Sequence, residues 1–277
     1  MIQRSAGRAM PAVLSLLLAA PLAAQTTAPA DSARALAVLR QAVEAHGGDA
    51  AVLRPGTVVV EAESQRRVAG QGYQPADEAA IRATFRSVID PANGRVRLEQ
   101  DQLWPGGYRF PAVNVLFQAG PGFAYDPDMF RGGSDLTRMT PEQVAAALAG
   151  SGRALPHLVL QQALQQAATL RYVGDGERGG RPVRTIAYTD AVGAELVLHF
   201  EARTGLMAAY ERRTAGAPAI TTDFGEYRVE GGVRVPAGYR VTQEGAPVVE
   251  WTLTRVSLGA PVADSLFAEP AGYAERP

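Results

Sequence analysis

The fold is decided by residues 181–200, which read RPVRTIAYTDAVGAELVLHF. Two runs within this segment, 183–188 and 194–200, are rich in β-branched, aromatic and other apolar residues, a composition typical of strands. Turn residues at 179–180 (Gly-Gly) and 204–205 (Thr-Gly) bound the two runs. The segment therefore predicts consecutive strands joined by short connections.

The same pattern continues to either side of this segment. Strand-like stretches separated by turn residues cover 169–173, 183–188, 194–200, 206–212, 219–228, 237–243 and 248–257. Strands that follow one another with short loops pair with their sequence neighbours. The C-terminal half therefore predicts an antiparallel meander rather than a crossover sheet.

The N-terminal half predicts one helix followed by more strands. Apolar residues at helical spacing indicate a helix capped by Asp31 or Ser32 and ended by Gly47. Alternation of apolar and polar residues then predicts strands at 58–63, 81–88, 96–98 and 108–118, with a turn at 90–94.

Two helices interrupt the strands in the middle of the chain. Thr140 and Gln143 form a capping-box pattern around Pro141, which predicts a helix ending near Gly150. Pro156 opens a second helix. The whole chain thus predicts an α+β fold, with one large antiparallel sheet, an N-terminal helix and two inserted helices.

Residues 1–24 have the pattern of a secretory signal peptide. Arg4 and Arg8 precede the apolar run Met10–Leu22, which is short for a membrane span, and small residues end at Ala24. A retained N-terminal anchor is the alternative interpretation. We expect three parts: a signal peptide cleaved near Ala24, a linker at 25–30 and a single domain at 31–277. Export in a Gram-negative cell leads to the periplasm, and without cysteine the mature chain cannot be lipidated.

The composition excludes several classes of function. The absence of cysteine rules out disulfide scaffolds, thiolate metal sites and cysteine nucleophiles. The 27 basic and 28 acidic residues nearly balance, which argues against a protein that binds nucleic acid by neutralising phosphates.

The sequence contains no recognisable catalytic, cofactor or metal site. Residues 174–179 read GDGERG and match the dinucleotide-binding pattern, but a strand rather than a helix follows, which predicts a hairpin loop. The three histidines, His46, His157 and His199, fall in separate elements, so we expect surface or capping roles for them and no shared metal ion. The expectation is a protein that is not an enzyme and needs no cofactor.

Several strand-and-turn motifs, together with the order of the elements, carry a family resemblance. The motifs are GRPV at 180–183, TIAY at 185–188, LVLHF at 196–200, RTGL at 203–206, FGEYR at 224–228, GGVRVP at 231–236 and DSLF at 264–267. The chain resembles the LolA-like fold of periplasmic lipoprotein-carrier and lipoprotein-sorting proteins. This resemblance implies a strongly curved sheet, a half-barrel, whose concave face is covered by helices.

The chain is also similar to the region that precedes the catalytic domain in some exported hydrolases of the metallo-β-lactamase fold. No H-x-H-x-D-H metal motif occurs in the sequence. On this alternative, the protein is the accessory N-terminal domain of a hydrolase whose catalytic domain is absent from this chain.

A curved sheet can enclose a cavity or a filled core, and composition alone favours the filled core. The LolA-like resemblance instead implies an exported, non-catalytic binding protein for an apolar ligand, either a lipid or the acyl chains of a lipoprotein. Its partners would be an apolar small molecule or a lipidated protein, with transient membrane or envelope-protein contact and no nucleic acid. The candidate cavity-lining residues are Phe85, Leu160, Ala163, Leu164, Leu198 and Trp251.

Overall fold

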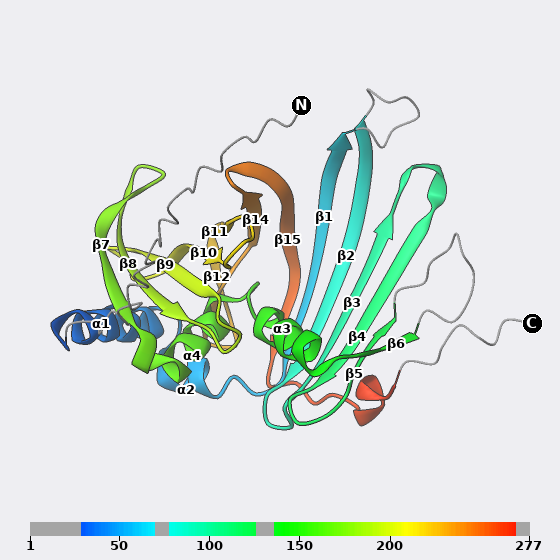
Figure 1. Ribbon diagram of the computed structural model, residues 1–277, viewed down its shortest axis with the longest axis horizontal. Coiled ribbons are helices and arrows are strands. Elements are labelled where there is room, and N and C mark those ends of the chain that lie inside the picture. The colour runs from blue at the N-terminus through cyan, green and yellow to red at the C-terminus, as the bar shows by residue number, and fades with distance from the viewer. Residues whose placement is uncertain (1–28, 70–77, 126–135, 270–277) are drawn as a thin grey trace, which may run out of the picture.

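The computed structural model describes residues 29–69, 78–125 and 136–269 (Figure 1). The predicted signal peptide at 1–24 and most of the linker lie outside these residues. Among the described helices, none has both the length and the apolar character needed to cross a membrane.

Thirteen of the strands within the described residues form one antiparallel sheet built from two meanders. The first meander is β1 (Val58–Ala69), β2 (Glu78–Asp90), β3 (Arg95–Leu103), β4 (Arg109–Phe117), β5 (Gly122–Tyr125) and β6 (Leu136–Met139). The second is β7 (Arg171–Arg178), β8 (Arg181–Thr189), β9 (Glu195–Glu201), β10 (Met207–Arg213), β11 (Ile220–Phe224), β14 (Gly238–Gln243) and β15 (Ala246–Leu258). The predicted large antiparallel sheet is confirmed.

The two meanders are joined where the first strand pairs with the last. Val58 of β1 lies opposite Leu258 of β15, and a β-bulge interrupts the register between Glu61 and Ala62. The strand order is therefore β6-β5-β4-β3-β2-β1-β15-β14-β11-β10-β9-β8-β7, and β6 and β7 are the two edges of an open sheet. We call the β1–β15 pair the seam.

In the described part of the chain, four helices accompany the sheet: α1 (Pro29–Ala45), α2 (Gly48–Leu53), α3 (Pro141–Ser151) and α4 (Pro156–Gln165). Short 3₁₀ turns occur at Pro105–Gly107, Ala167–Thr169 and Asp264–Phe267. Figure 1 shows α3 and α4 between the two arms of the curved sheet. The predicted helices are confirmed, except that α1 begins at Pro29, which places Asp31 in its first turn rather than at its cap.

The capping box predicted at the start of α3 is present. The Gln143 backbone N–H donates to Thr140 Oγ1 at 3.3 Å, and the Thr140 backbone N–H donates to Gln143 Oε1 at 2.8 Å. We expect Thr140→Ala to lower the free energy of unfolding by about 1 kcal/mol, because one helical N–H loses its acceptor. Urea unfolding measures this change, and Ser265→Ala, at an exposed position of the turn Asp264–Phe267, serves as the control. A loss no larger than that of the control would contradict it.

The apolar side chains form three clusters. One packs α1, α2 and α4 against β8, β9 and β10, with Leu39, Leu160 and Leu198 fully buried. A second joins the inner face of β1–β4 and β15 to α3, and a third lies on the outer face around Phe267. The helices and the first two clusters share one face of the sheet, which we call the inner face.

Two predicted strand boundaries are wrong. Residues 174–178 continue β7 instead of forming a loop, and the hairpin turn falls at 179–180. The predicted strand at 219–228 breaks after Phe224, because the chain leaves the sheet there to form the separate hairpin of β12 (Tyr227–Glu230) and β13 (Val233–Pro236). This hairpin is held against the end of α1 by a hydrogen bond from the Arg234 backbone N–H to the His46 carbonyl at 3.1 Å.

Candidate functional site

A row of aromatic side chains crosses the inner face of the sheet. Its rings come from Phe85 on β2, Trp251 on β15, Tyr239 on β14, Phe224 on β11 and Tyr210 on β10. Ring centroids are 5.9 Å apart for Phe85 and Trp251, 6.4 Å for Phe224 and Tyr239, and 6.0 Å for Tyr210 and Phe224. Trp251 and Tyr239 are cross-strand partners. We call these five side chains the aromatic row.

The small side chain of Ala62 allows two of these rings to meet across the seam. Ala62 on β1 lies opposite Phe85 on one side and Leu253 on the other, and it is only 2% exposed. The next inner-face residue of β1, Ser64, lies opposite Trp251, so only small side chains of β1 stand beside the two rings. Both rings remain partly exposed, so the row presents apolar surface at the centre of the inner face.

The six candidate lining residues fall into two groups. Leu160, Ala163 and Leu198 have no exposed surface and lie in the core between α4 and the strands β8–β10, with Leu164 partly buried beside them. Phe85 and Trp251 lie together in the second cluster and keep partial exposure. The sequence pattern proposed all six as lining residues, but it could not separate the packed group from the accessible one.

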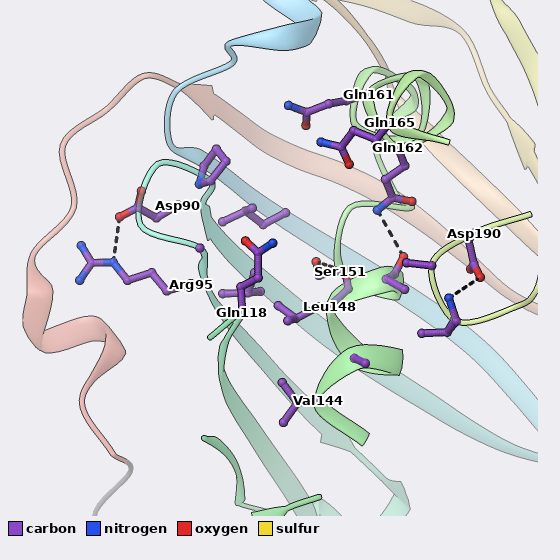
Figure 2. A pocket seen from close by; sticks show the side chains of 18 of the residues that line it. Asp90, Arg95, Gln118, Val144, Leu148, Ser151, Gln161, Gln162, Gln165 and Asp190 are labelled. Carbon is purple, nitrogen blue, oxygen red and sulfur yellow. Dashed lines mark hydrogen bonds and ion pairs between the residues drawn. The ribbon is translucent and has the colours of Figure 1, made fainter. Parts of the chain in front are cut away.

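A cavity of about 540 Å³ lies at the end of the inner face, between the two inserted helices and the turns of the sheet (Figure 2). Its apolar wall includes Ile89, Val96, Val144 and Leu148. Its polar lining includes the amides of Gln118, Gln161, Gln162, Gln165 and Gln166 and the acidic residues Asp90 and Asp190. We call it the glutamine cavity. It brings together β2, β3, the β4–β5 turn, α3, α4 and the β8–β9 turn, and no local sequence pattern indicated it.

Both carboxylates of the cavity are neutralised by arginine. Burial alone would raise the pKa of Asp90, but hydrogen bonds from Asn93 and Arg95, each 2.8 Å long, outweigh it and hold the pKa below its usual value. Asp190 pairs with Arg153 at 2.7 Å and accepts the Ala194 backbone N–H at 2.8 Å. The cavity therefore has no uncompensated carboxylate.

The predicted surface or capping roles are wrong for two histidines. His46 and His157 are fully buried. His46 Nε2 accepts the Met207 backbone N–H at 3.5 Å, so its Nδ1 carries the proton and donates to the Ala42 carbonyl at 2.8 Å. Among the described residues, His157 has no hydrogen-bond partner at either ring nitrogen. Burial lowers the pKa of His46 to about 4 and that of His157 to about 3.

His199 lies on the outer face, as its strand alternation predicted. Its ring contacts Thr185 at 3.1 Å and Glu211 at 3.3 Å. The three histidines do not converge, and within residues 29–69, 78–125 and 136–269 no group of three or more histidine or carboxylate side chains could hold a metal ion.

Solved structures of low sequence identity share this architecture over most of the chain. A domain named for outer membrane lipoprotein sorting, from Vibrio parahaemolyticus, has a TM-score of 0.51 and 11% identity, covering 86% of this chain and 97% of that one. A LolA superfamily protein from Nitrosomonas europaea has a TM-score of 0.51 and 10% identity, covering 84% and 97%. The chain has a LolA-like fold.

The LolA-like fold confirms the resemblance drawn from the strand-and-turn motifs, including the open, curved sheet with helices on its inner face. In sequence, the chain matches no family profile and no curated protein. The similarity to LolA-like structures is therefore one of fold.

Proposed function

We propose that the protein is an exported, non-catalytic binding protein for an apolar ligand, a lipid or the acyl chains of a lipoprotein, in the periplasm. The observation that carries this proposal is the aromatic row on the inner face, in which four residues are partly exposed (Phe85, Trp251, Tyr239 and Phe224) and Tyr210 is buried. Each methylene group that such a surface removes from water contributes about 0.8 kcal/mol, so an acyl chain is well suited to it.

Two further observations support the proposal. The pattern of basic residues, apolar run and small residues at 1–24 is that of an exported chain. The LolA-like neighbours include a protein named for lipoprotein sorting in the outer membrane. We further propose that Phe85 and Trp251 contact the ligand, while Leu160, Ala163, Leu164 and Leu198 support the sheet behind it.

The proposal is tested by tryptophan fluorescence. The chain has two tryptophans, so Trp104→Phe leaves Trp251 as the only reporter. A brominated C16 fatty acid bound at the aromatic row is expected to quench Trp251. Separately, Trp251→Ala is expected to weaken binding of a fluorescent C16 fatty acid about tenfold, or about 1.4 kcal/mol, because the largest ring of the row is lost.

Tyr108→Ala is the matched control, because this aromatic side chain is 56% exposed and is not part of the row. Its fatty-acid affinity should equal that of the unmodified protein. Lipid extraction from protein purified from its native envelope supplies a second measurement. A protein that arrives without lipid, binds no fluorescent fatty acid and shows no quenching of Trp251 does not have the proposed function.

A further inference from the structure

The glutamine cavity has the size of a binding site and is separate from the aromatic row. Its volume of about 540 Å³ falls within the roughly 300–1,000 Å³ of small-molecule sites. None of the five side chains of the aromatic row is among its lining residues. The kind of ligand that suits the cavity therefore follows from its own lining, independently of the proposed function.

The charges of the cavity favour a neutral ligand. Asp90 Oδ2 lies 2.8 Å from Arg95 Nε, and Asp190 Oδ2 lies 2.7 Å from Arg153 Nη2. The guanidinium of Arg95 is shared further with Asp264 at 2.7 Å. A cation or an anion would lose its hydration here without gaining a free counter-charge, which is unfavourable.

The lining also disfavours a hydrocarbon chain and a flat aromatic ring. Five glutamine side chains surround the cavity, and a hydrocarbon placed among them would take water from their amides without replacing its hydrogen bonds. None of the described lining residues is aromatic, so a flat ring finds no partner for stacking. The apolar part of the wall is aliphatic and includes Ile89, Val96, Val144 and Leu148.

The amides stand on two sides of the cavity. Figure 2 shows Gln161, Gln162 and Gln165 on α4, with Gln118 across the opening on the sheet side. Gln118 and Gln165 are exposed, so their side chains can turn toward a ligand. Each primary amide offers two donors and an acceptor, which suits a ligand that carries several hydroxyl groups.

One of these amides has an oxygen without a partner. Gln162 Oε1 is buried and accepts no hydrogen bond from the described residues. Its Nε2 donates to the Ala149 carbonyl at 3.4 Å, which is long for a hydrogen bond. The amide can therefore rotate about its terminal torsion and present the oxygen to the cavity. A ligand O–H or N–H that pairs with this acceptor removes the cost of leaving it unsatisfied.

We propose that the glutamine cavity binds a neutral sugar of one or two rings. Sugar hydroxyl groups both donate and accept, so they can pair with the amides on both sides of the cavity and with Gln162 Oε1. The C–H groups of the sugar ring cover the aliphatic wall. This polar site differs in chemistry from the apolar site proposed at the aromatic row.

Isothermal titration calorimetry of the full mature chain tests the proposal with a matched pair of disaccharides at about pH 6. N,N′-diacetylchitobiose is neutral, whereas chitobiose has the same two rings with protonated amino groups. Chitobiose is expected to bind at least about tenfold more weakly, because its charges find no counter-charge in the cavity. Gln118→Leu and Gln165→Leu are each expected to weaken the binding of diacetylchitobiose about fivefold, because hydrogen bonds to the sugar are lost.

Gln243→Leu, on an exposed side chain at the end of β14 and outside the cavity lining, is the matched control and should keep the full affinity. Gln118 and Gln165 are exposed, so their variants are expected to fold and to bind a fluorescent C16 fatty acid as the unmodified protein does. No binding of diacetylchitobiose, equal binding of chitobiose, or full affinity in both variants overturns the inference. Tighter binding of a neutral pentapeptide, acetylated and amidated at its ends, also overturns it and assigns the cavity to a peptide.

Discussion

Acidification from about pH 8 to about pH 5 is expected to lower the free energy of unfolding by about 4 kcal/mol through His46 and His157 alone. Burial lowers the pKa of these side chains from 6.5 to about 4 and about 3. Below pH 6.5 the unfolded chain therefore binds protons that the folded protein excludes. The contribution of the two neutral histidines to the free energy of unfolding is complete above pH 6.5. It is lost as the pH falls toward the two lowered pKa values, and by pH 5 the loss is about 2 kcal/mol for each histidine.

Urea unfolding at the two pH values measures this effect, and His157→Leu separates it from the titration of carboxylates. In this variant, the fall in the free energy of unfolding between pH 8 and pH 5 should be smaller by about 2 kcal/mol, the share of one histidine. At pH 8 it should be at least as stable as the unmodified protein, because two unpaired ring nitrogens leave the core. His199→Gln is the comparison. Burial also lowers the pKa of His199, but Glu211 opposes this effect, so His199→Gln should alter the acid sensitivity less than His157→Leu does. Equal acid sensitivity in His157→Leu and the unmodified protein would contradict the prediction.

Leu198→Ala is expected to lower the free energy of unfolding by about 2–5 kcal/mol and to leave the affinity for a fatty acid unchanged. Leu198 has no exposed surface, and it lies between Ile186 and Tyr210 on the strands beside it. Removing its side chain leaves a void that the surrounding core can close only in part. Trp251→Ala should behave in the opposite way, with weaker binding and a smaller loss of stability, because its ring is partly exposed.

Denaturant unfolding and fatty-acid titration of the two variants test this separation together. Val173→Ala, at an exposed position of the edge strand β7, should change the stability by no more than about 0.5 kcal/mol. If Leu198→Ala instead weakens ligand binding and leaves stability unchanged, Leu198 lines the ligand site and the division of the six candidate residues is wrong.

Local sequence signals predicted most elements of this fold. The capping box at Thr140 depends on residues three positions apart, and the turn after Asp90 depends on neighbouring residues, so both were visible in the sequence. Alternation likewise predicted the strands around Leu198, and it correctly placed His199 on the opposite face of β9.

Features that depend on distant parts of the chain were not visible. Whether His46 and His157 are buried depends on which segments cover the ends of α1 and α4, and alternation within one helix does not carry that information. The break after Phe224 was missed because strand-like residues resume at Tyr227 after only two residues, while the chain leaves the sheet. The glutamine cavity is formed by strands, helices and turns that are distant in sequence, from β2 to the β8–β9 turn, so no single segment could indicate it.

The seam gives this architecture a particular folding problem. Each meander can form by pairing strands that are near in sequence, whereas Val58 and Leu258 must meet from positions about two hundred residues apart. The entropy lost in closing so long a loop is recovered only when both meanders already present β1 and β15 in register. Until then the unpaired edges of β1 and β15 are exposed. Each edge can pair with the complementary strand of a neighbouring molecule. We therefore expect domain-swapped dimers, in which two molecules exchange whole arms, as the main misassembled form of this protein.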